Sequence, residues 1–302
     1  MVADPISVVV ERGGVVESVH AVHAAVVRDG ALVGAAGNAG LVTFMRSAAK
    51  PFQALPLAEE EPDLPADELA IACASHEATA EQLRLVGALL ERAGASEDDL
   101  ACGEEHGSKA GHHCSGKHAG MLLRARRHGW PREGYEQAGH PLQGELLAVL
   151  AGAAGVPPGE IPTATDGCGV PTFALSLEAM ARAFARLARR ELPGSERVAA
   201  AMLTHPELVG GANAADTALM RARPGLLAKR GAEGVLCAAF PDGTGVAVKV
   251  ADGANRAAGP ALAALTGIQE LEERPVLNSR CREVGRLFPR WENSGSLFPK
   301  GM

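Results

Sequence analysis

The sequence is poor in aromatic residues, which make up only 3% of its 302 residues. Its core must therefore be built mainly from Ala, Val and Leu. Hydrophobic residues account for 47% and charged residues for 22%, an ordinary balance for a soluble globular protein. The net charge is −7 and no strongly basic patch stands out, which argues against a nucleic-acid or membrane-surface partner.

Several targeting and cofactor signals are also missing. We find no basic segment followed by an apolar one at the start of the chain, and no apolar run of membrane-spanning length. The six cysteines are too scattered for a disulfide scaffold, so we expect a cytoplasmic protein whose reduced thiols fill the core or bind a metal. Neither a GxGxxG nor a Walker motif suggests a nucleotide cofactor.

The order of predicted elements favours an α+β fold in a single domain covering residues 1–302. Residues 6–35 alternate apolar and polar, with a turn at Asp29-Gly30, which predicts antiparallel strands. Two further strands are expected at 234–240 and 246–250, and a short one near 285–287. An antiparallel sheet assembled from both chain ends and covered by helices accounts for this pattern.

The long middle of the chain has helical periodicity. The expected helices cover 47–57, 65–74, 79–93, 114–127, 141–154, 171–190, one or two segments within 194–223, and 255–265. The segments 102–113 and 163–170 are instead rich in glycine and polar residues, and we interpret both as ordered loops.

Ser47 and Lys50 form the first candidate catalytic pair, at the predicted opening of a helix. Residues three apart share a helical face, so the amine can come close to the hydroxyl. A lysine whose pKa is depressed by burial can act as the base that activates a serine. The motif alone is weak, because Ser-x-x-Lys occurs by chance roughly once in a chain of this length. Its ordinary interpretation is a capping serine and a solvated lysine.

Ser75 and Lys249 are two more candidates. Ser75 stands beside His76 at the end of a predicted helix, where a capping role is the ordinary alternative. Lys249 lies between valines on a predicted strand. Such a lysine usually points to solvent, but it becomes a candidate base if that face of the sheet is covered.

A third group combines thiols, imidazoles and an amine. Cys114, Lys117 and His118 are spaced to face one way on a helix, and thiolate and imidazole are good zinc ligands. A second segment must complete the site. The glycine-rich run 165–171 is the best source, with Cys168 as a ligand and Asp166 as a substrate-binding or supporting group. Buried structural cysteines beside a His-rich surface loop are an equally good interpretation of the spacing.

Taken together, these segments resemble the asparaginase II family, the Rhizobium-type (class 3) L-asparaginases. The matching runs follow family order and are 46–56, 74–76, 114–120, 165–171, 229–235 and 249–253. Cys-Ser-Gly-Lys-His-Ala-Gly at 114–120 is the most specific of them. The resemblance extends over about residues 7 to 290.

The resemblance implies a fold similar to serine β-lactamases and penicillin-binding proteins. It also implies two neighbouring Ser–Lys pairs, Ser47 with Lys50 and Ser75 with Lys249. A zinc (Zn²⁺) site made by Cys114, Lys117 and Cys168 would lie beside them, and the molecule would be a homodimer. The lysine ligand must be deprotonated to bind metal.

The leading functional hypothesis is hydrolysis of L-asparagine to aspartate and ammonia. Ser47 would attack the carboxamide with Lys50 as base, and Ser75 and Lys249 would relay the proton and keep Lys50 neutral. Arg46, His118 and Asp166 are the candidates for binding the substrate's ammonium and carboxylate groups. On paper either serine could be the nucleophile.

Two other functions remain open from the sequence. One is a β-lactamase-like or peptidase-like acyl hydrolase that uses the same Ser-x-x-Lys pair, although Ser-x-Asn and Lys-Thr-Gly elements are missing after the serine. The other is a zinc-binding protein without catalytic activity, which would give no role to Ser47, Ser75 or Lys249.

Overall fold

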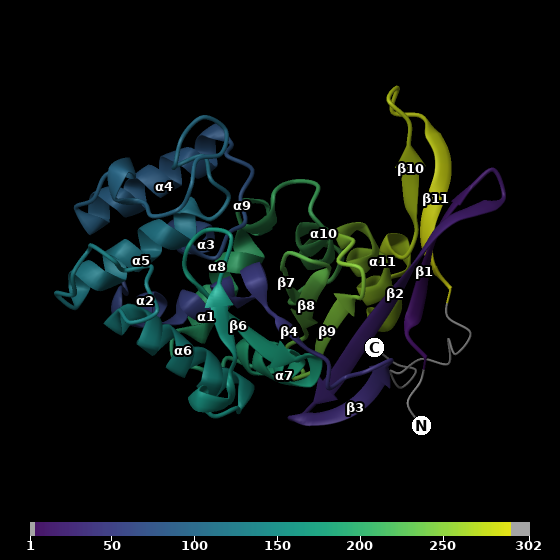
Figure 1. Cartoon of the computed structure of the whole chain (residues 1–302), viewed down its shortest axis with the longest axis horizontal. Coiled ribbons are helices and arrows are strands. Elements are labelled where there is room, and N and C mark those ends of the chain that lie inside the picture. Colours follow the sequence, from purple (N-terminus) through teal and green to yellow (C-terminus); the bar gives the residue numbers. More distant parts are fainter. Residues whose placement is uncertain (1–3, 291–302) are drawn as a thin grey trace.

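The computed structural model describes residues 4–290 and has mixed α+β architecture. Most helices gather on one side of the molecule, and a large antiparallel sheet lies on the other with a few helices packed beside it (Figure 1). The sheet combines strands from the two ends of the chain, as the sequence predicts.

The large sheet has eight strands, all paired antiparallel. Its order is β10-β11-β1-β2-β9-β8-β7, and β3 pairs with the far end of the long strand β2. The strands are β1 (Ile6–Arg12), β2 (Val15–Arg28), β3 (Ala31–Ala36), β7 (Leu227–Arg230), β8 (Val235–Ala239), β9 (Gly245–Val250), β10 (Arg274–Leu277) and β11 (Glu283–Arg290).

The middle of the chain is mostly helical, with a small sheet of order β4-β6-β5. Its strands are β4 (Val42–Phe44), β5 (Thr163–Thr165) and β6 (Pro171–Ser176). The α-helices are α1 (Lys50–Gln53), α2 (Leu55–Glu60), α3 (Ala66–Ala72), α4 (Ala80–Ala93), α5 (Ser115–Arg127), α6 (Pro141–Ala154), α7 (Leu177–Ala188), α8 (Ser195–Thr204), α9 (Pro206–Gly210), α10 (Ala215–Ala222) and α11 (Asn255–Thr266). Short 3-10 turns are η1 (Arg46–Ala49), η2 (Glu97–Asp99), η3 (Pro158–Glu160) and η4 (Gln269–Leu271).

Most predicted elements are confirmed, with three corrections. The helix expected over 171–190 begins only at Leu177, because residues 171–176 pair with β4 and β5 as strand β6. The predicted helix 47–57 is broken into η1, α1 and α2. Strands β4, β5, β7 and β10 were not predicted, since each is only three or four residues long and shows no clear alternation.

The hydrophobic core joins the helices of the middle of the chain to the large sheet. Successive residues of β9 are completely buried, which requires cover on both faces, and α7 and α11 both pack against this strand. Phe52 of α1 meets Phe184 of α7 edge to face, with ring centroids 5.2 Å apart. This contact ties α1, and with it Lys50, to the helix that covers the sheet.

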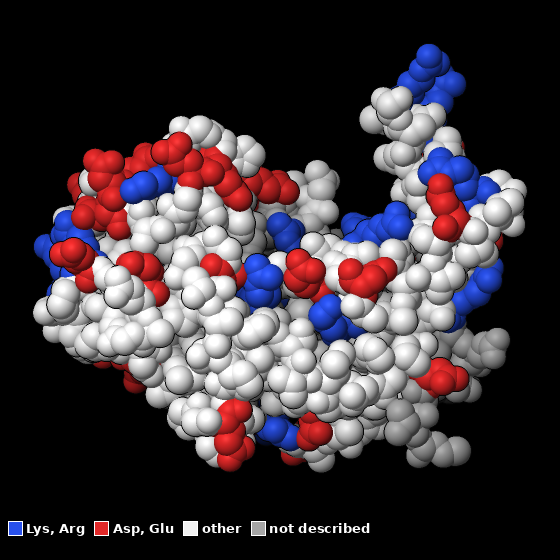
Figure 2. Space-filling model, in the orientation of Figure 1, with Lys and Arg blue, Asp and Glu red and all other residues white. Residues whose placement is uncertain are grey.

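The surface carries charge of both signs. Acidic side chains gather over α4 and the following turn, and Arg280 and Arg282 cap the projecting β10–β11 hairpin (Figure 2). None of the helices in residues 4–290 has the length and apolar character needed to cross a membrane.

Candidate active site

Ser47 lies in a short turn that is held in an unusual backbone conformation. The residue before it, Arg46, has φ of 52°, a left-handed value that costs a non-glycine residue about 1–2 kcal/mol. Such strain is often found where a side chain is held in position for function. Ser47 is half-buried, and its hydroxyl makes no hydrogen bond with any other residue of 4–290. The hydroxyl is therefore free to meet a ligand.

Ser75 lies between two buried lysines. Its Oγ is 3.1 Å from Nζ of Lys50 and 3.1 Å from Nζ of Lys229. Lys50 also donates to the carbonyl oxygens of Ala74 and His113, and both lysine side chains are almost completely buried. A hydroxyl flanked by two amines can accept a proton from one side and donate it to the other, so Ser75 is placed to move protons.

The second lysine is not the one predicted from the sequence. Lys249 was expected beside Ser75, but its Nζ donates to the carbonyl oxygen of Val250, next to it on β9, and Lys229 occupies the position beside Ser75. The strand order β9-β8-β7 explains the difference, because it places Lys249 two strands away, roughly 10 Å at the usual strand spacing.

Burial favours the neutral form of both lysines at this site. It lowers the pKa of Lys50 from its ordinary value, against the opposing effect of the Cys114 thiolate. Burial also lowers the pKa of Lys229 to about 8, although the nearby Asp216 carboxylate opposes this effect. The positive charge of Lys50 adds a further decrease to the pKa of Lys229. Both lysines are thus better bases near neutral pH than a solvated lysine.

Asp216 balances this cluster of cations. It is completely buried on α10, 3.4 Å from Nζ of Lys229 and 3.3 Å from Nη1 of Arg230. It also accepts a hydrogen bond from the backbone N–H of Arg230. Burial alone would raise the pKa of Asp216, but the two cations reverse this and lower it, so the residue is a carboxylate.

A cavity of about 190 Å³ opens directly above the two serines. It is smaller than the roughly 300–1,000 Å³ typical of pockets for drug-sized ligands, so it suits a molecule the size of an amino acid. The residues that line it are Ser47, Ser75, His76, His113, Arg230, Gly231, Ala232 and Asn255.

Gly231 brings the two halves of this cavity together. A Cβ atom added there would lie 2.4 Å from the carbonyl oxygen of Met45, which no real contact allows. Only glycine lets the β7–β8 turn approach the segment that carries Ser47. The residue therefore lets the end of strand β7 lie against the turn that carries Ser47.

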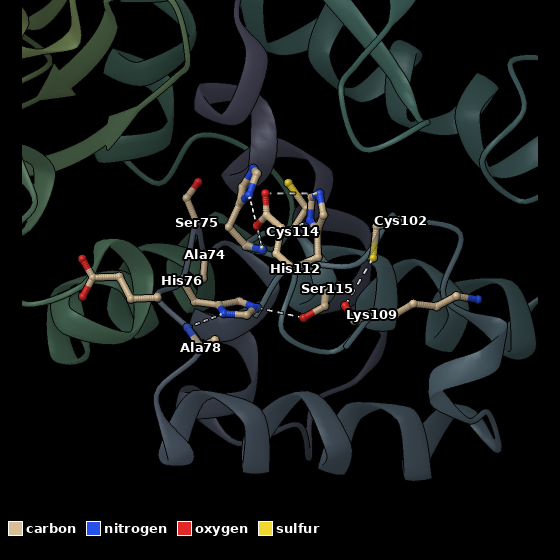
Figure 3. Close-up of polar contacts among 12 residues, drawn as sticks. Ala74, Ser75, His76, Ala78, Cys102, Lys109, His112, Cys114 and Ser115 are labelled. Carbon is tan, nitrogen blue, oxygen red and sulfur yellow. Dashed lines mark hydrogen bonds and ion pairs between the residues drawn. The ribbon is translucent and has the colours of Figure 1, made fainter. Parts of the chain in front are cut away.

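The loop that carries Ser75 is fixed by a hydrogen-bond chain through His76. The backbone N–H of Ala78 donates to Nδ1 of His76, whose Nε2 then carries the proton and lies 2.8 Å from Oγ of Ser115 (Figure 3). Ser115 donates in turn to the carbonyl oxygen of Ala110. Burial lowers the pKa of His76 to about 4, so it stays neutral and acts here as a structural residue.

The three predicted metal ligands lie together in a buried cluster near Lys50. Nζ of Lys117 is 2.9 Å from Sγ of Cys168, and the Cys114 and Cys168 thiols share a hydrogen bond. That hydrogen bond lowers the pKa of Cys114 well below its ordinary value and raises the pKa of Cys168. The arrangement thus combines a thiolate, a thiol and a lysine in one buried cluster, which becomes a donor set for a metal once the thiol and the lysine lose their protons.

A second set of possible ligands shares Cys114. Ligand atoms of His112, His113 and Cys114 all lie within 4.8 Å of one another, so this group could hold a metal ion. Two of the imidazole nitrogens already have partners. Nδ1 of His112 accepts the N–H of Cys114, and Nδ1 of His113 is 2.7 Å from the Glu105 carboxylate. Nε2 of His112 lies 4.0 Å from a carboxylate oxygen of Glu105, so a metal bound by His112 would compete with this contact.

The predicted substrate-binding residues are arranged differently from one another. Arg46 and Asp166 pair with each other, with Nε to Oδ1 at 2.6 Å, and both keep some exposure. His118 is completely buried, and its Nδ1 lies 2.7 Å from the Tyr135 hydroxyl. Its Nε2 has no hydrogen-bond partner among the described residues. None of these three residues lines the cavity above the serines.

Sequence reasoning missed several residues of this site, including Lys229, Arg230, Asp216 and Asn255. One signal for two of them was present, because Lys229 and Arg230 open the matching run 229–235. Asp216 and Asn255 carry no comparable sequence signal. Their positions follow from tertiary packing: α10 packs on β7, and Asn255 at the start of α11 contacts Gly234 in the turn between β7 and β8.

The chain was compared with models of known protein families. The family model for L-asparaginase II matches residues 8–287. The chain belongs to the L-asparaginase II family. The clustered serines, lysines and cysteines lie within the matched range.

The comparison with individual proteins adds little to the family assignment. A search of the curated proteins finds no match. Among solved structures, the chain is similar to Mglu in its native form in the presence of 4.3 M NaCl, at 18% identity and a TM-score of 0.39. That match covers 82% of this chain and 61% of Mglu, so the chain spans less than two thirds of it. A second Mglu structure matches at 16% identity and a TM-score of 0.39, covering 83% of this chain and 67% of the other.

Proposed function

We propose that the protein hydrolyses L-asparagine to aspartate and ammonia. One observation carries the proposal: the Ser75 hydroxyl lies 3.1 Å from each of two buried lysines at the floor of a small cavity that Ser47 also lines. Two serines and two amines of lowered pKa are the groups that acyl transfer requires. Membership in the L-asparaginase II family supports an amide as the substrate.

In the first half of the reaction, Ser47 Oγ attacks the carboxamide carbon and Lys50 takes its proton. The proton passes through Ser75 to the amide nitrogen, the C–N bond breaks, and ammonia leaves. Neutral Lys229 favours this transfer, because a second positive charge would oppose protonation of Lys50. In the second half, water attacks the ester and gives its proton to Lys50. Aspartate leaves, and Ser47 regains its hydroxyl proton.

Two backbone amides are candidates for stabilising the oxyanion. The N–H groups of Ser47 and Ala232 belong to residues that border the cavity, and neither makes a hydrogen bond with the rest of residues 4–290. Free amide donors that face developing negative charge contribute more to catalysis than most other groups, commonly about 10²–10³-fold for one donor.

We further propose that Cys114, Lys117 and Cys168 hold a zinc ion. The 2.9 Å contact of Lys117 with Cys168 and the hydrogen bond between the two cysteines support this set. Zinc bound there would neutralise the thiolate charge and fix the loop around Cys168. Lys117 would have to lose a proton for this role, because only a neutral amine can bind a metal. The neighbouring thiols outweigh burial and raise the pKa of Lys117, so the proton is held until the metal displaces it.

Metal analysis can distinguish the two overlapping ligand sets. We expect purified protein to contain about one zinc per chain, and Cys168→Ala to lose most of it, since a thiolate ligand contributes strongly to zinc affinity. His112→Ala, the matched change in the other set, should retain the metal. Inductively coupled plasma mass spectrometry measures both. Zinc loss in His112→Ala with retention in Cys168→Ala would assign the metal to the histidines instead.

The function itself is tested by ammonia release. We expect the protein to release ammonia from L-asparagine, and we would compare L-glutamine, a β-lactam and a chelator-treated sample in parallel. Release from neither amide would contradict the proposal. Hydrolysis of the β-lactam alone would favour the acyl-hydrolase alternative, and zinc binding without any turnover would favour a non-enzymatic metal protein.

Other expectations stay predictions. We propose that the fold is of the serine β-lactamase and penicillin-binding-protein type, supported by a sheet from both chain ends with Ser47 and Lys50 at its border with the helices. The single catalytic domain and the cytoplasmic location remain proposals from the sequence, and the homodimer remains a proposal from the resemblance to the asparaginase II family.

A further inference from the structure

The cavity above the serines is electrostatically one-sided. Among residues 4–290, no carboxylate lines it, and Arg230 is the one lining residue with a permanent positive charge. Asp216, the nearest acidic partner in contact with Arg230, is completely buried and is shared with Lys229. An anionic group that enters this space is therefore attracted by Arg230 and is not repelled by a carboxylate in the lining.

Arg230 is held rigidly but keeps donors free. Its Nη1 donates to Oδ1 of Asp216, and its Nη2 donates to the carbonyl oxygen of Ser75, both at 3.3 Å. A guanidinium has five N–H donors, so two engaged donors leave three for a ligand. The side chain is 33% exposed, which leaves its free edge accessible. A planar fork already fixed in place is well suited to bind a carboxylate.

Asn255 offers a second donor on the same cavity. It is the first residue of α11, and its Oδ1 accepts the backbone N–H of Gly234 at 2.7 Å. This bond fixes the orientation of the amide. The NH₂ group makes no hydrogen bond with other described residues, so it can donate to a ligand.

We propose that Arg230, assisted by Asn255, binds the α-carboxylate of the substrate. The inference rests on the proposed amidohydrolase function and assigns its specificity to these residues. Arg230 borders the same small cavity as Ser47 and Ser75, so a molecule as short as asparagine can place its carboxylate at Arg230 and keep its carboxamide within the cavity that both serines line. The preferred substrates are then small amides that carry a free carboxylate.

Arg46 is the competing candidate for this role. Its guanidinium is neutralised by Asp166 at 2.6 Å, and neither residue lines the cavity. The charge of Arg230 is less fully neutralised, because its carboxylate partner Asp216 also pairs with Lys229. The assignment therefore favours Arg230 over the residue that the sequence suggested.

The test compares two substrates on the same enzyme samples. 3-Aminopropanamide is asparagine with its α-carboxylate replaced by hydrogen. We expect the wild-type ratio of kcat/KM for asparagine over 3-aminopropanamide to fall about 10²-fold in Arg230→Met, mainly through KM for asparagine. Because both substrates are measured on one sample, partial misfolding cancels from the ratio. Arg230→Lys should recover part of the ratio, whereas Arg46→Met should keep it.

Binding measurements make the test independent of turnover. In a Ser47→Ala background, calorimetry should show asparagine binding about 10²-fold more weakly after Arg230→Met. Equal losses for both substrates, or loss of the ratio in Arg46→Met instead, would overturn the assignment. If asparagine binds through Arg230 but the wild-type protein releases no ammonia, the proposed function fails while this inference stands.

Discussion

Replacing Ser47 with alanine is expected to lower kcat for L-asparagine at least about 10³-fold, because the nucleophile is lost and only binding and oxyanion stabilisation remain. Ser47 lines the cavity and its hydroxyl is free, whereas Ser75 is almost completely buried and engaged by two lysines. The first hydroxyl is thus the better placed to attack. Steady-state ammonia release on the purified variant measures the loss.

Loss of activity alone does not separate the two serines, since Ser75→Ala would also break the proton path. An acyl adduct does separate them. Rapid acid quench during turnover, followed by peptide mass spectrometry, should find the added aspartyl group on the peptide that contains Ser47. An adduct on the peptide containing Ser75, or near wild-type turnover by Ser47→Ala, would overturn the assignment.

Replacing Lys229 with methionine is expected to lower kcat/KM by about 10²–10⁴-fold, the usual range for a group that assists proton transfer. Methionine roughly fills the same buried space but removes the amine 3.1 Å from Ser75. In this variant the buried Asp216 keeps only Arg230 as its cationic partner, which could destabilise the fold. Circular dichroism of the wild type and the variant would show whether the fold is retained.

The pH dependence of kcat/KM in the wild-type enzyme should reflect the titration of Lys229. Since the pKa of Lys229 is about 8, it is protonated below that pH and its charge opposes proton transfer to Lys50. We therefore expect kcat/KM to rise through pH 8 and to decrease toward tenfold per unit below it. A profile that falls as the pH rises through 8 would mean that the charged lysine is the active form.

Lys249→Met is the matched control for this prediction. Burial also lowers the pKa of Lys249, yet its Nζ contacts the backbone of its own strand and not a serine. This variant should keep kcat/KM within about threefold of wild type and preserve the limb near pH 8. A loss in Lys249→Met as large as in Lys229→Met would restore the pairing suggested by the sequence.

The sequence predicted local structure well where the signal is local. Thr79 caps α4 as expected, with a reciprocal bond to Gln82, and Gly94 ends that helix in a left-handed conformation. The prediction of a helix over residues 171–176 was wrong, because a run of buried residues is compatible with either a helix or a strand covered on both faces. Its partners β4 and β5 decided the outcome, and neither is visible from periodicity.

By itself, the sequence determined the family, the assembly of the sheet from both chain ends, and the serine, thiol and amine groups available for chemistry. Tertiary structure alone decided which lysine faces Ser75. The register pairs Lys229 with Cys237 and Cys237 with Ala247, so Lys229 and Lys249 share a face of the sheet and look alike from strand alternation. The strand order separates them. It is set by long-range pairing, which brings β7 and not β9 next to the turn that carries Ser47.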